Sequence, residues 1–117
     1  MTELEMKQRT KAFALRVIKL TSTLSKDFVG RRLGDQLLRS GTSVAANYRA
    51  ACRARSNADF VSKLAVAEEE ADESGLWMEL LVEAGIVPER RLQKLVDEAN
   101  QLTAIIVASR KTAKKRV

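Results

Sequence analysis

Five residues with carboxylate side chains, which can bind metal ions or transfer protons, lie close together in the second half of the chain. They are Glu68, Glu69, Glu70, Asp72 and Glu73. Such a cluster could hold a divalent metal ion or supply a general acid and a general base. On a helix, however, these spacings spread the carboxylates around half of the circumference, so they do not converge on one point. We therefore expect ion pairs with neighbouring basic helices or with a second subunit, and no metal site.

Nucleophilic chemistry has little support elsewhere in the chain. Histidine is absent, which removes Ser–His and Cys–His pairs, histidine general bases and histidine metal ligands. Cys52 is the only cysteine, and its place on an apolar helical stripe favours a small buried hydrophobe over a nucleophile. The sequence thus predicts a protein that is not an enzyme, has no catalytic residue and needs no cofactor. A metal-dependent enzyme that uses the carboxylates of residues 68–73 is the less favoured alternative.

Apolar residues repeat with a helical period along most of the 117 residues, and no segment alternates with period two. Three short breaks divide the chain into four segments of similar length. The predicted helices span about 2–24, 31–52, 57–84 and 88–112, and a basic tail covers 110–117. Similar helix lengths and short loops predict a single domain over 1–117 with an all-α fold, an antiparallel up-down-up-down four-helix bundle.

Capping signals mark the ends of these predicted helices. Ser56 with Asp59 three residues later predicts a capping box at the start of the third helix. Gly85 is a plausible C-terminal cap, and Pro88 suits the first turn of the fourth helix. Gly75 lies inside the third helix, where glycine costs about 1 kcal/mol relative to alanine, so we expect a packing reason for it.

The cellular compartment is predicted from three features. A single cysteine fits a reducing environment. The first residues contain no apolar run that could serve as a secretory signal. The longest aliphatic stretch, residues 104–108, is too short to span a bilayer. The sequence therefore predicts a cytoplasmic protein without a membrane partner.

The net charge of +6 hides a strong segregation along the chain. Residues 26–57 carry a net +5, residues 58–85 a net −7 and residues 86–117 a net +5. The basic residues form either a solvated face with a frayed, soluble tail or a surface that binds phosphates without reading sequence. No aromatic residues interleave with the arginines, so stacking on bases is not supported. The candidate nucleic-acid-binding residues are Arg32, Arg39, Arg49, Arg53, Arg55, Lys111, Lys114, Lys115 and Arg116.

The third helix has more apolar residues than one buried stripe needs. Val66, Trp77 and Leu80 project away from the face that carries Phe60 and Met78. A second apolar face on an outer helix is typical of a partner surface, and tryptophan is a favoured interface anchor. A wider contact with the fourth helix is the alternative. We favour self-association, with closed symmetry as the default.

Two blocks of sequence resemble those of a bacterial protein family. The first is residues 36–49, QLLRSGTSVAANYR, which continues through Ala51–Ser56; the second includes EEADE at 69–73 and WMELLVEAG at 77–85. Together they resemble the bacterial four-helix-bundle family, which is similar to proteins encoded in intervening sequences of 23S rRNA genes and to the accessory subunit of diversity-generating retroelements. The resemblance covers about residues 10–107.

The resemblance implies a homopentameric barrel of up-down bundles, and its retroelement branch implies binding of nucleic acid and of a reverse transcriptase. Carried over by position, the polar signature residues are Arg39, Ser43, Asn47, Arg53, Arg55 and Glu73. Two departures from the family pattern stand out. Ala50 occupies a position where related sequences often have glutamate, and Ser74-Gly75-Leu76 replaces a bulkier trio.

The leading hypothesis is a non-enzymatic homo-oligomer, expected to be a pentamer, that offers a basic surface to RNA or DNA. Val66, Glu73, Trp77 and Leu80 are the candidate oligomer interface. The alternative function is a scaffold or adaptor that binds another protein and no nucleic acid.

Overall fold

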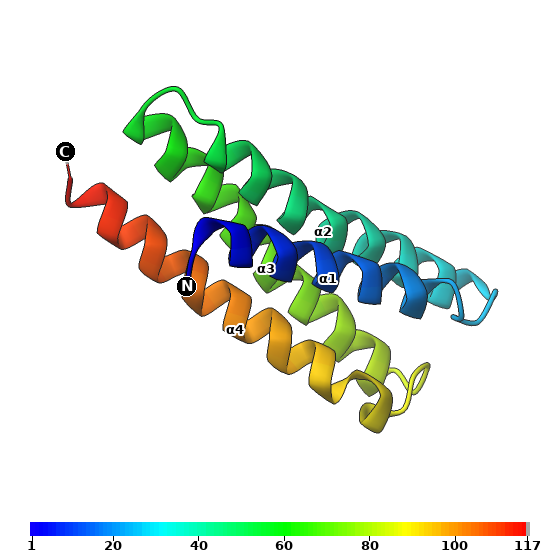
Figure 1. Ribbon diagram of the computed structural model, residues 1–117. Helices are drawn as coiled ribbons and strands as arrows, with labels where there is room; N and C mark the ends of the chain where they lie inside the picture. Colours follow the sequence, from blue (N-terminus) through cyan, green and yellow to red (C-terminus); the bar gives the residue numbers. More distant parts are fainter. Residues whose placement is uncertain (117) are drawn as a thin grey trace.

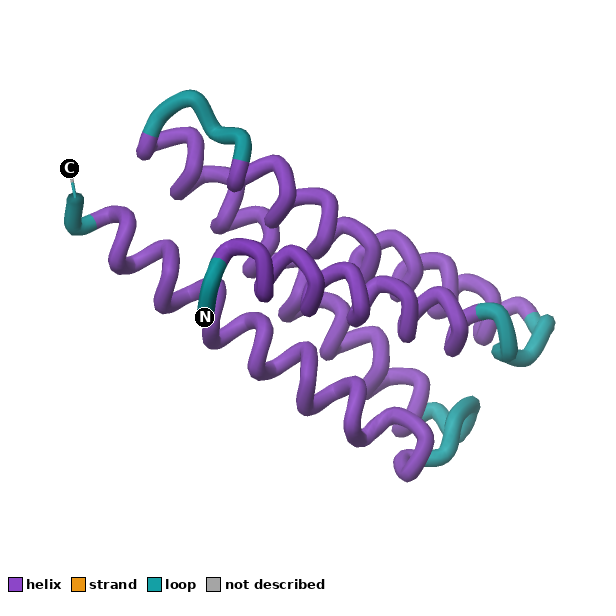
Figure 2. Tube along the Cα trace, viewed as in Figure 1, coloured by secondary structure: helices purple, strands orange, loops and turns teal. Residues whose placement is uncertain are grey.

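Four helices arranged side by side make up the molecule (Figures 1 and 2). The structure, a computed structural model, describes residues 1–116. The helices are α1 (Glu3–Thr21), α2 (Phe28–Cys52), α3 (Asn57–Glu83) and α4 (Glu89–Lys114). Successive helices run in opposite directions through short loops, and the described residues contain no strand. The predicted all-α four-helix fold is confirmed.

N-terminal caps explain where α1 and α3 begin. Thr2 and Glu5 form a full capping box, in which the Thr2 hydroxyl accepts from the Glu5 N–H and the Glu5 carboxylate accepts from the Thr2 N–H. The hydrogen bond from the Thr2 hydroxyl lowers the pKa of Glu5. Ser56 accepts from the Asp59 N–H at 3.0 Å, so the predicted cap of α3 is confirmed. The Asp59 side chain instead accepts from Lys63, so this cap is not the predicted box.

The C-terminal end of α3 follows the sequence prediction. Gly85 adopts a φ of +74°, in the left-handed region that glycine enters without strain. The Gly85 N–H donates to the Val82 carbonyl and the Ile86 N–H donates to the Leu81 carbonyl. These two bonds form a Schellman motif, which satisfies carbonyls that the helix leaves free. Pro88 then forms the N-terminal cap of α4.

Two helix ends differ from the predicted bounds near the first loop. Helix α1 ends at Thr21, where the hydroxyls of Thr21, Ser22 and Thr23 donate back to carbonyls of the preceding turn. Such bonds compete with continuation of the helix. Helix α2 begins at Phe28, three residues before the predicted start, because the Asp27 carboxylate accepts from the Gly30 N–H at 2.7 Å.

The fourth helix ends two residues beyond its predicted end at 112, so most of the predicted basic tail at 110–117 is helical and the interpretation as a frayed end does not hold there. Helix α4 continues to Lys114, and Ala113 is buried. The Ala113 carbonyl accepts from the Asn57 side-chain amide at 2.8 Å, which ties the end of α4 to the start of α3. Only Val117 lies outside the described residues.

The core runs along the bundle axis and consists mainly of aliphatic side chains. Residues without solvent exposure come from all four helices and include Val17, Leu37, Leu64 and Leu102. Leu33, Cys52 and Phe60, expected on the inner stripes, are partly buried and pack against this core. The apolar periodicity therefore predicted the buried faces well.

The backbones of α1 and α4 approach each other least among neighbouring helices, and α1 and α3 lie diagonally across the core. One polar cluster spans this open seam. Arg9 donates through Nε and Nη2 to the two carboxylate oxygens of Glu98, both at 2.7 Å, and also to the Gln101 side chain at 2.7 Å. A bidentate pair of this kind combines charge with fixed geometry. It fastens α1, the shortest helix, to α4.

Glycines have different roles in the two central helices. A Cβ at Gly41 would lie 2.8 Å from a methyl of Val17, so glycine is needed for α1 to approach α2 this closely. At Gly75 the nearest atom, Asn100 Oδ1, would be 3.9 Å away. We expected a close helix contact to require glycine at position 75, but no contact within the protomer does so.

Candidate nucleic-acid interface

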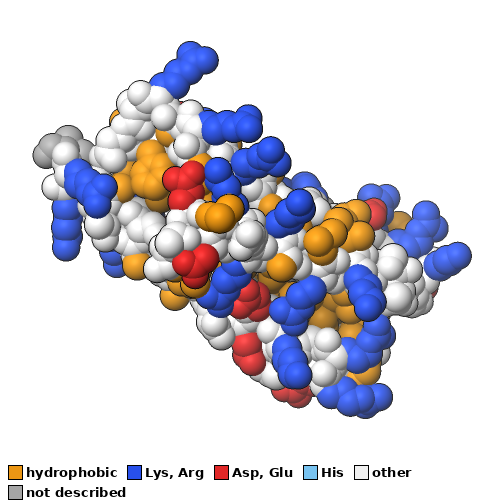
Figure 3. Space-filling model, in the orientation of Figure 1, with side chains coloured by type: hydrophobic (Ala, Val, Ile, Leu, Met, Phe, Trp, Pro, Cys, Tyr) orange, Lys and Arg blue, Asp and Glu red, His pale blue; other side chains and the backbone are white. Residues whose placement is uncertain are grey.

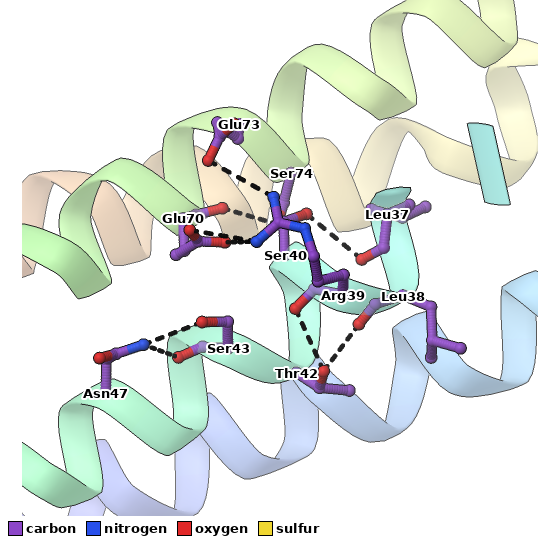
Figure 4. Close-up of polar contacts among 10 residues, drawn as sticks. All are labelled: Leu37, Leu38, Arg39, Ser40, Thr42, Ser43, Asn47, Glu70, Glu73 and Ser74. Carbon is purple, nitrogen blue, oxygen red and sulfur yellow. Dashed lines mark hydrogen bonds and ion pairs between the residues drawn. The ribbon is translucent and has the colours of Figure 1, made fainter. Parts of the chain in front are cut away.

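The carboxylates of α3 are largely engaged by arginines of neighbouring helices. Arg110 of α4 donates to Glu68 at 2.7 Å. Arg39 of α2 donates to Glu70 at 3.1 Å and lies 3.8 Å from Glu73 (Figure 4). The prediction of ion pairing with basic helices is confirmed for these three carboxylates. Within residues 1–116, no group of three or more metal-ligating side chains gathers in one place.

Arg39 departs from its predicted role as a free phosphate contact. Its guanidinium is shared between Glu70 and Glu73, so much of its charge is neutralised inside the protomer. The Ser40 and Ser74 hydroxyls beside it lie 2.9 Å apart and are buried (Figure 4). Ser74, one of the departures from the family pattern, therefore joins α2 to α3 within the protomer and does not face another subunit.

The amide of Asn47 is engaged within α2. Asn47 Nδ2 donates to the Ser43 carbonyl at 2.9 Å and to the Ser43 hydroxyl at 2.8 Å (Figure 4). Both side chains are only partly buried. Two of the polar signature residues thus contact each other one helical turn apart.

A basic groove lies between α1 and α2. We call it the α1/α2 groove; its volume is about 620 Å³. The lining consists of Lys7, Gln8, Lys11, Ala45, Ala46, Arg49 and Arg53. Four of these seven side chains are cationic and none is acidic. Glu3 lies just outside the lining and pairs with Lys7 at 3.2 Å, in an exposed i, i+4 contact.

The other three cations of the groove are available to a ligand. Lys11, Arg49 and Arg53 are exposed, and none of them has an ion-pair partner among the residues that the structure describes. Arg49 and Arg53 were predicted from their place on α2. Lys7 and Lys11 were missed, because their contribution depends on how α1 packs beside α2.

Several predicted cations gather at one end of the bundle. Arg53 and Arg55 lie where α2 passes to α3, and the end of α4 is tied to the start of α3 by the Asn57–Ala113 bond. Figure 1 shows the α2–α3 loop and the end of α4 at the same end of the bundle. The exposed residues that this brings to one end are Arg53, Arg55, Lys111, Lys114, Lys115 and Arg116.

Arg32 lies at the opposite end of α2, separate from the groove. Its guanidinium lies 5.2 Å from the centroid of the Phe28 ring, which is 71% exposed. This cation–π contact orients the arginine and keeps its charge. Figure 3 shows basic side chains predominating over acidic ones across the face on which α1 lies.

The predicted oligomer interface on α3 is partly supported by exposure. Val66 and Leu80 are 38% and 37% exposed, and Leu76 is 47% exposed. Trp77 is half-buried and packs against the core, so it does not project as an interface anchor. Its indole Nε1 is buried without a hydrogen-bond partner among the described residues. Glu73 pairs with Arg39.

A second exposed apolar region was missed in the sequence. Leu15 and Ile18 of α1 are 57% and 43% exposed, and Leu38 of α2 is 38% exposed. Leu15 and Ile18 are three residues apart, so they share one side of α1 that faces away from Phe13 and Val17. Because α1 and α3 are diagonal in the bundle, this region and the outer side of α3 lie on opposite faces.

Cys52 has the environment of an unreactive thiol. It is half-buried against the core near Tyr48 and Glu3. Burial, followed by the negative charge of Glu3, raises the pKa of Cys52. Burial likewise raises the pKa of Tyr48. The Cys52 side chain therefore stays a neutral thiol near pH 7, as the sequence indicated.

None of the helices in residues 1–116 combines the length and apolar character that crossing a membrane requires. The geometry defines the class of protein: an up-down four-helix bundle with a basic α1/α2 side and internally paired carboxylates. The chain belongs to the family of 23S rRNA-intervening sequence proteins, whose family model matches residues 2–108.

A solved structure agrees with this assignment. The chain is similar to a protein with unknown function from the S23 ribosomal protein family of Bacteroides thetaiotaomicron, at 32% identity and a TM-score of 0.87. The match covers 95% of this chain and 99% of the other. The comparison with curated proteins found no match.

Proposed function

We propose that this protein is a non-enzymatic, oligomeric binding protein that contacts RNA or DNA through its basic surface. The observation that carries the proposal is the α1/α2 groove, where cations from two helices meet without an acidic residue in the lining. Phosphate backbones supply the matching negative charge. The α3 carboxylates do not neutralise this side, since Glu68 and Glu70 are held by arginines elsewhere.

RNA is the first ligand to test, because the family description names 23S rRNA. The groove lacks aromatic side chains, which agrees with contact to the sugar–phosphate backbone and not with stacking on bases. Binding of this kind reads little sequence, so we expect DNA of the same length to bind as well.

The oligomer is proposed from the two apolar regions on opposite faces. A head-to-tail contact needs two different surfaces on each protomer, and it closes into a ring when the rotation permits. The outer side of α3, with Leu76 and Leu80, would meet the α1 side of the next protomer, with Leu15 and Ile18. A pentamer is the ring size that the family resemblance implies.

The experiment is a titration of labelled RNA and DNA by fluorescence anisotropy at low and at moderate salt, with solution mass measured by light scattering. We expect binding to both nucleic acids that weakens steeply as salt increases. Absence of binding at low salt, or an affinity that does not change with salt concentration, would overturn the proposal.

The second candidate function is a protein adaptor. The exposed Leu76 and Leu80 favour it, because an apolar helix side can equally bind a different protein. Affinity capture followed by nuclease treatment separates the two functions. A protein partner that stays bound after nuclease treatment, together with no affinity for nucleic acid, would establish the adaptor.

A further inference from the structure

The contact between Val17 and Gly41 sets the register of α1 against α2. A Cβ at Gly41 would be 2.8 Å from Val17 Cγ2, so these two residues lie at the same level. The helices are antiparallel, so Lys11 lies near the level of residue 47 and Lys7 near the level of residue 51. Lys11 and Lys7 therefore alternate along the groove with Arg49 and Arg53.

This alternation forms a ladder of four cations. Successive levels are two residues apart, which corresponds to about 3 Å along the helix axis. The two walls contribute in turn, so that a chain lying in the groove has positive charge on both sides. Between the walls the lining residues Ala45 and Ala46 are small and leave room for a backbone.

We propose that the α1/α2 groove binds the phosphodiester backbone of a single strand, which threads between the lysines of α1 and the arginines of α2. This inference rests on the proposed function and identifies the site and the form of the nucleic acid. A single strand can enter a recess and be neutralised from both walls. A duplex is wide and stiff, so its phosphates meet only the tips of the protruding side chains. The bases point outward, since the groove has no aromatic platform for them.

The first test removes charge from the groove. Lys11→Ala and Arg49→Ala are compared with Arg90→Ala and Lys94→Ala, which remove exposed cations of α4 outside the lining. Short labelled single strands of RNA and of DNA are titrated across a range of salt. Each groove variant is expected to reduce the slope of log K against log salt by about 0.7, the value for one phosphate contact on a single strand. The α4 variants should leave the slope unchanged.

The second test fills the groove and keeps its charge. Ala46→Leu adds an apolar side chain at an exposed helical position on the groove lining, and Ala104→Leu makes the same change at an exposed position of α4. Ala46→Leu should weaken single-strand binding more than duplex binding, whereas Ala104→Leu should weaken neither. Circular dichroism and solution mass show that each variant keeps the wild-type fold and assembly.

The outcomes separate this inference from the proposed function. If the wild-type protein binds nucleic acid and the groove variants bind as it does, the site is wrong and the proposed function stands. If Ala46→Leu weakens single-strand and duplex binding equally, the inference that a single strand threads through the groove is overturned. If the wild-type protein binds no nucleic acid at low salt, both the inference and the proposed function are overturned.

Discussion

Val17 and Gly41 pack so closely that a single methyl group at position 41 would overlap the valine side chain. The hypothetical Cβ lies 2.8, 2.9 and 3.1 Å from three atoms of Val17. Valine is branched at Cβ and has little rotamer freedom in a helix, so it cannot move aside easily. This contact therefore fixes both the separation and the register of α1 and α2, which in turn set the geometry of the basic groove.

Gly41→Ala should destabilise the fold. Alanine favours the helix by about 1 kcal/mol, but overpacking typically costs about 1–3 kcal/mol. We expect a net loss of up to about 2 kcal/mol in the free energy of unfolding, measured by urea titration. Gly75→Ala is the matched control, because its Cβ has space, and it should gain about 0.5–1 kcal/mol. Equal effects of the two substitutions would contradict this account of the helix contact.

The Arg9–Glu98 pair should contribute more to stability than an exposed ion pair. Its side chains are 24% and 17% exposed, and it fastens α1 across the open seam to α4. Glu98→Gln is expected to lower the free energy of unfolding by about 1–2 kcal/mol, since hydrogen bonds to charged groups are stronger than neutral ones. Glu3→Gln breaks an exposed pair with Lys7 and should cost less than about 0.5 kcal/mol. A loss in Glu98→Gln no larger than in Glu3→Gln would show that the seam is held by other contacts.

Cys52 should react slowly with alkylating reagents near neutral pH. Its raised pKa keeps the thiolate fraction small, so the reaction should accelerate only at a pH above that of an ordinary cysteine. Glu3→Gln removes a negative charge that raises this pKa, and it should shift the rate profile to lower pH. The rate is followed by mass spectrometry with iodoacetamide, with the urea-unfolded chain as reference. Folded and unfolded chains that react at the same rate at pH 7 would disprove the buried-thiol description.

Assembly should depend on both apolar faces. Leu80→Glu on α3 and Leu15→Glu on α1 should each reduce the solution mass toward the 13.0 kDa of one chain, because a head-to-tail ring uses both surfaces. Val29→Glu adds the same charge at an exposed apolar residue near the start of α2 and should leave the mass unchanged. A wild-type mass of 13.0 kDa in light scattering would rule out the ring.

The fold was largely predictable because each helix carries its own apolar period. Core residues such as Leu37, Leu64 and Leu102 follow directly from spacing along one helix. The α3 cap at Ser56 and the glycine at 85 were also readable, since caps depend on residues only a few positions apart. The ends of α1 and α4 were harder to predict. Side-chain hydroxyls that donate to backbone carbonyls end α1, and the hydrogen bond from Asn57 to the Ala113 carbonyl holds the end of α4.

The candidate site depends on how the helices pack against one another, and the spacing of residues along one helix does not reveal this. Arg49 and Arg53 were found from α2 alone, but their partners Lys7 and Lys11 join them only through the register of α1 against α2. Arg39 was taken as a free cation because its spacing on α2 says nothing about Glu70 on the next helix. Arg9 and Glu98 are 89 residues apart, and no local pattern pairs them.

The central claim is that the basic surface binds nucleic-acid phosphates, and the salt dependence of the wild-type affinity tests it most directly. The measurement is the slope of log K against log salt for a labelled single-stranded RNA. If Lys11, Arg49 and Arg53, which have no ion-pair partner within residues 1–116, each neutralise one phosphate and release its counterions, the slope should be about −2.1 or steeper, at about −0.7 per phosphate contact. A slope near zero, or no binding at low salt, would contradict the claim.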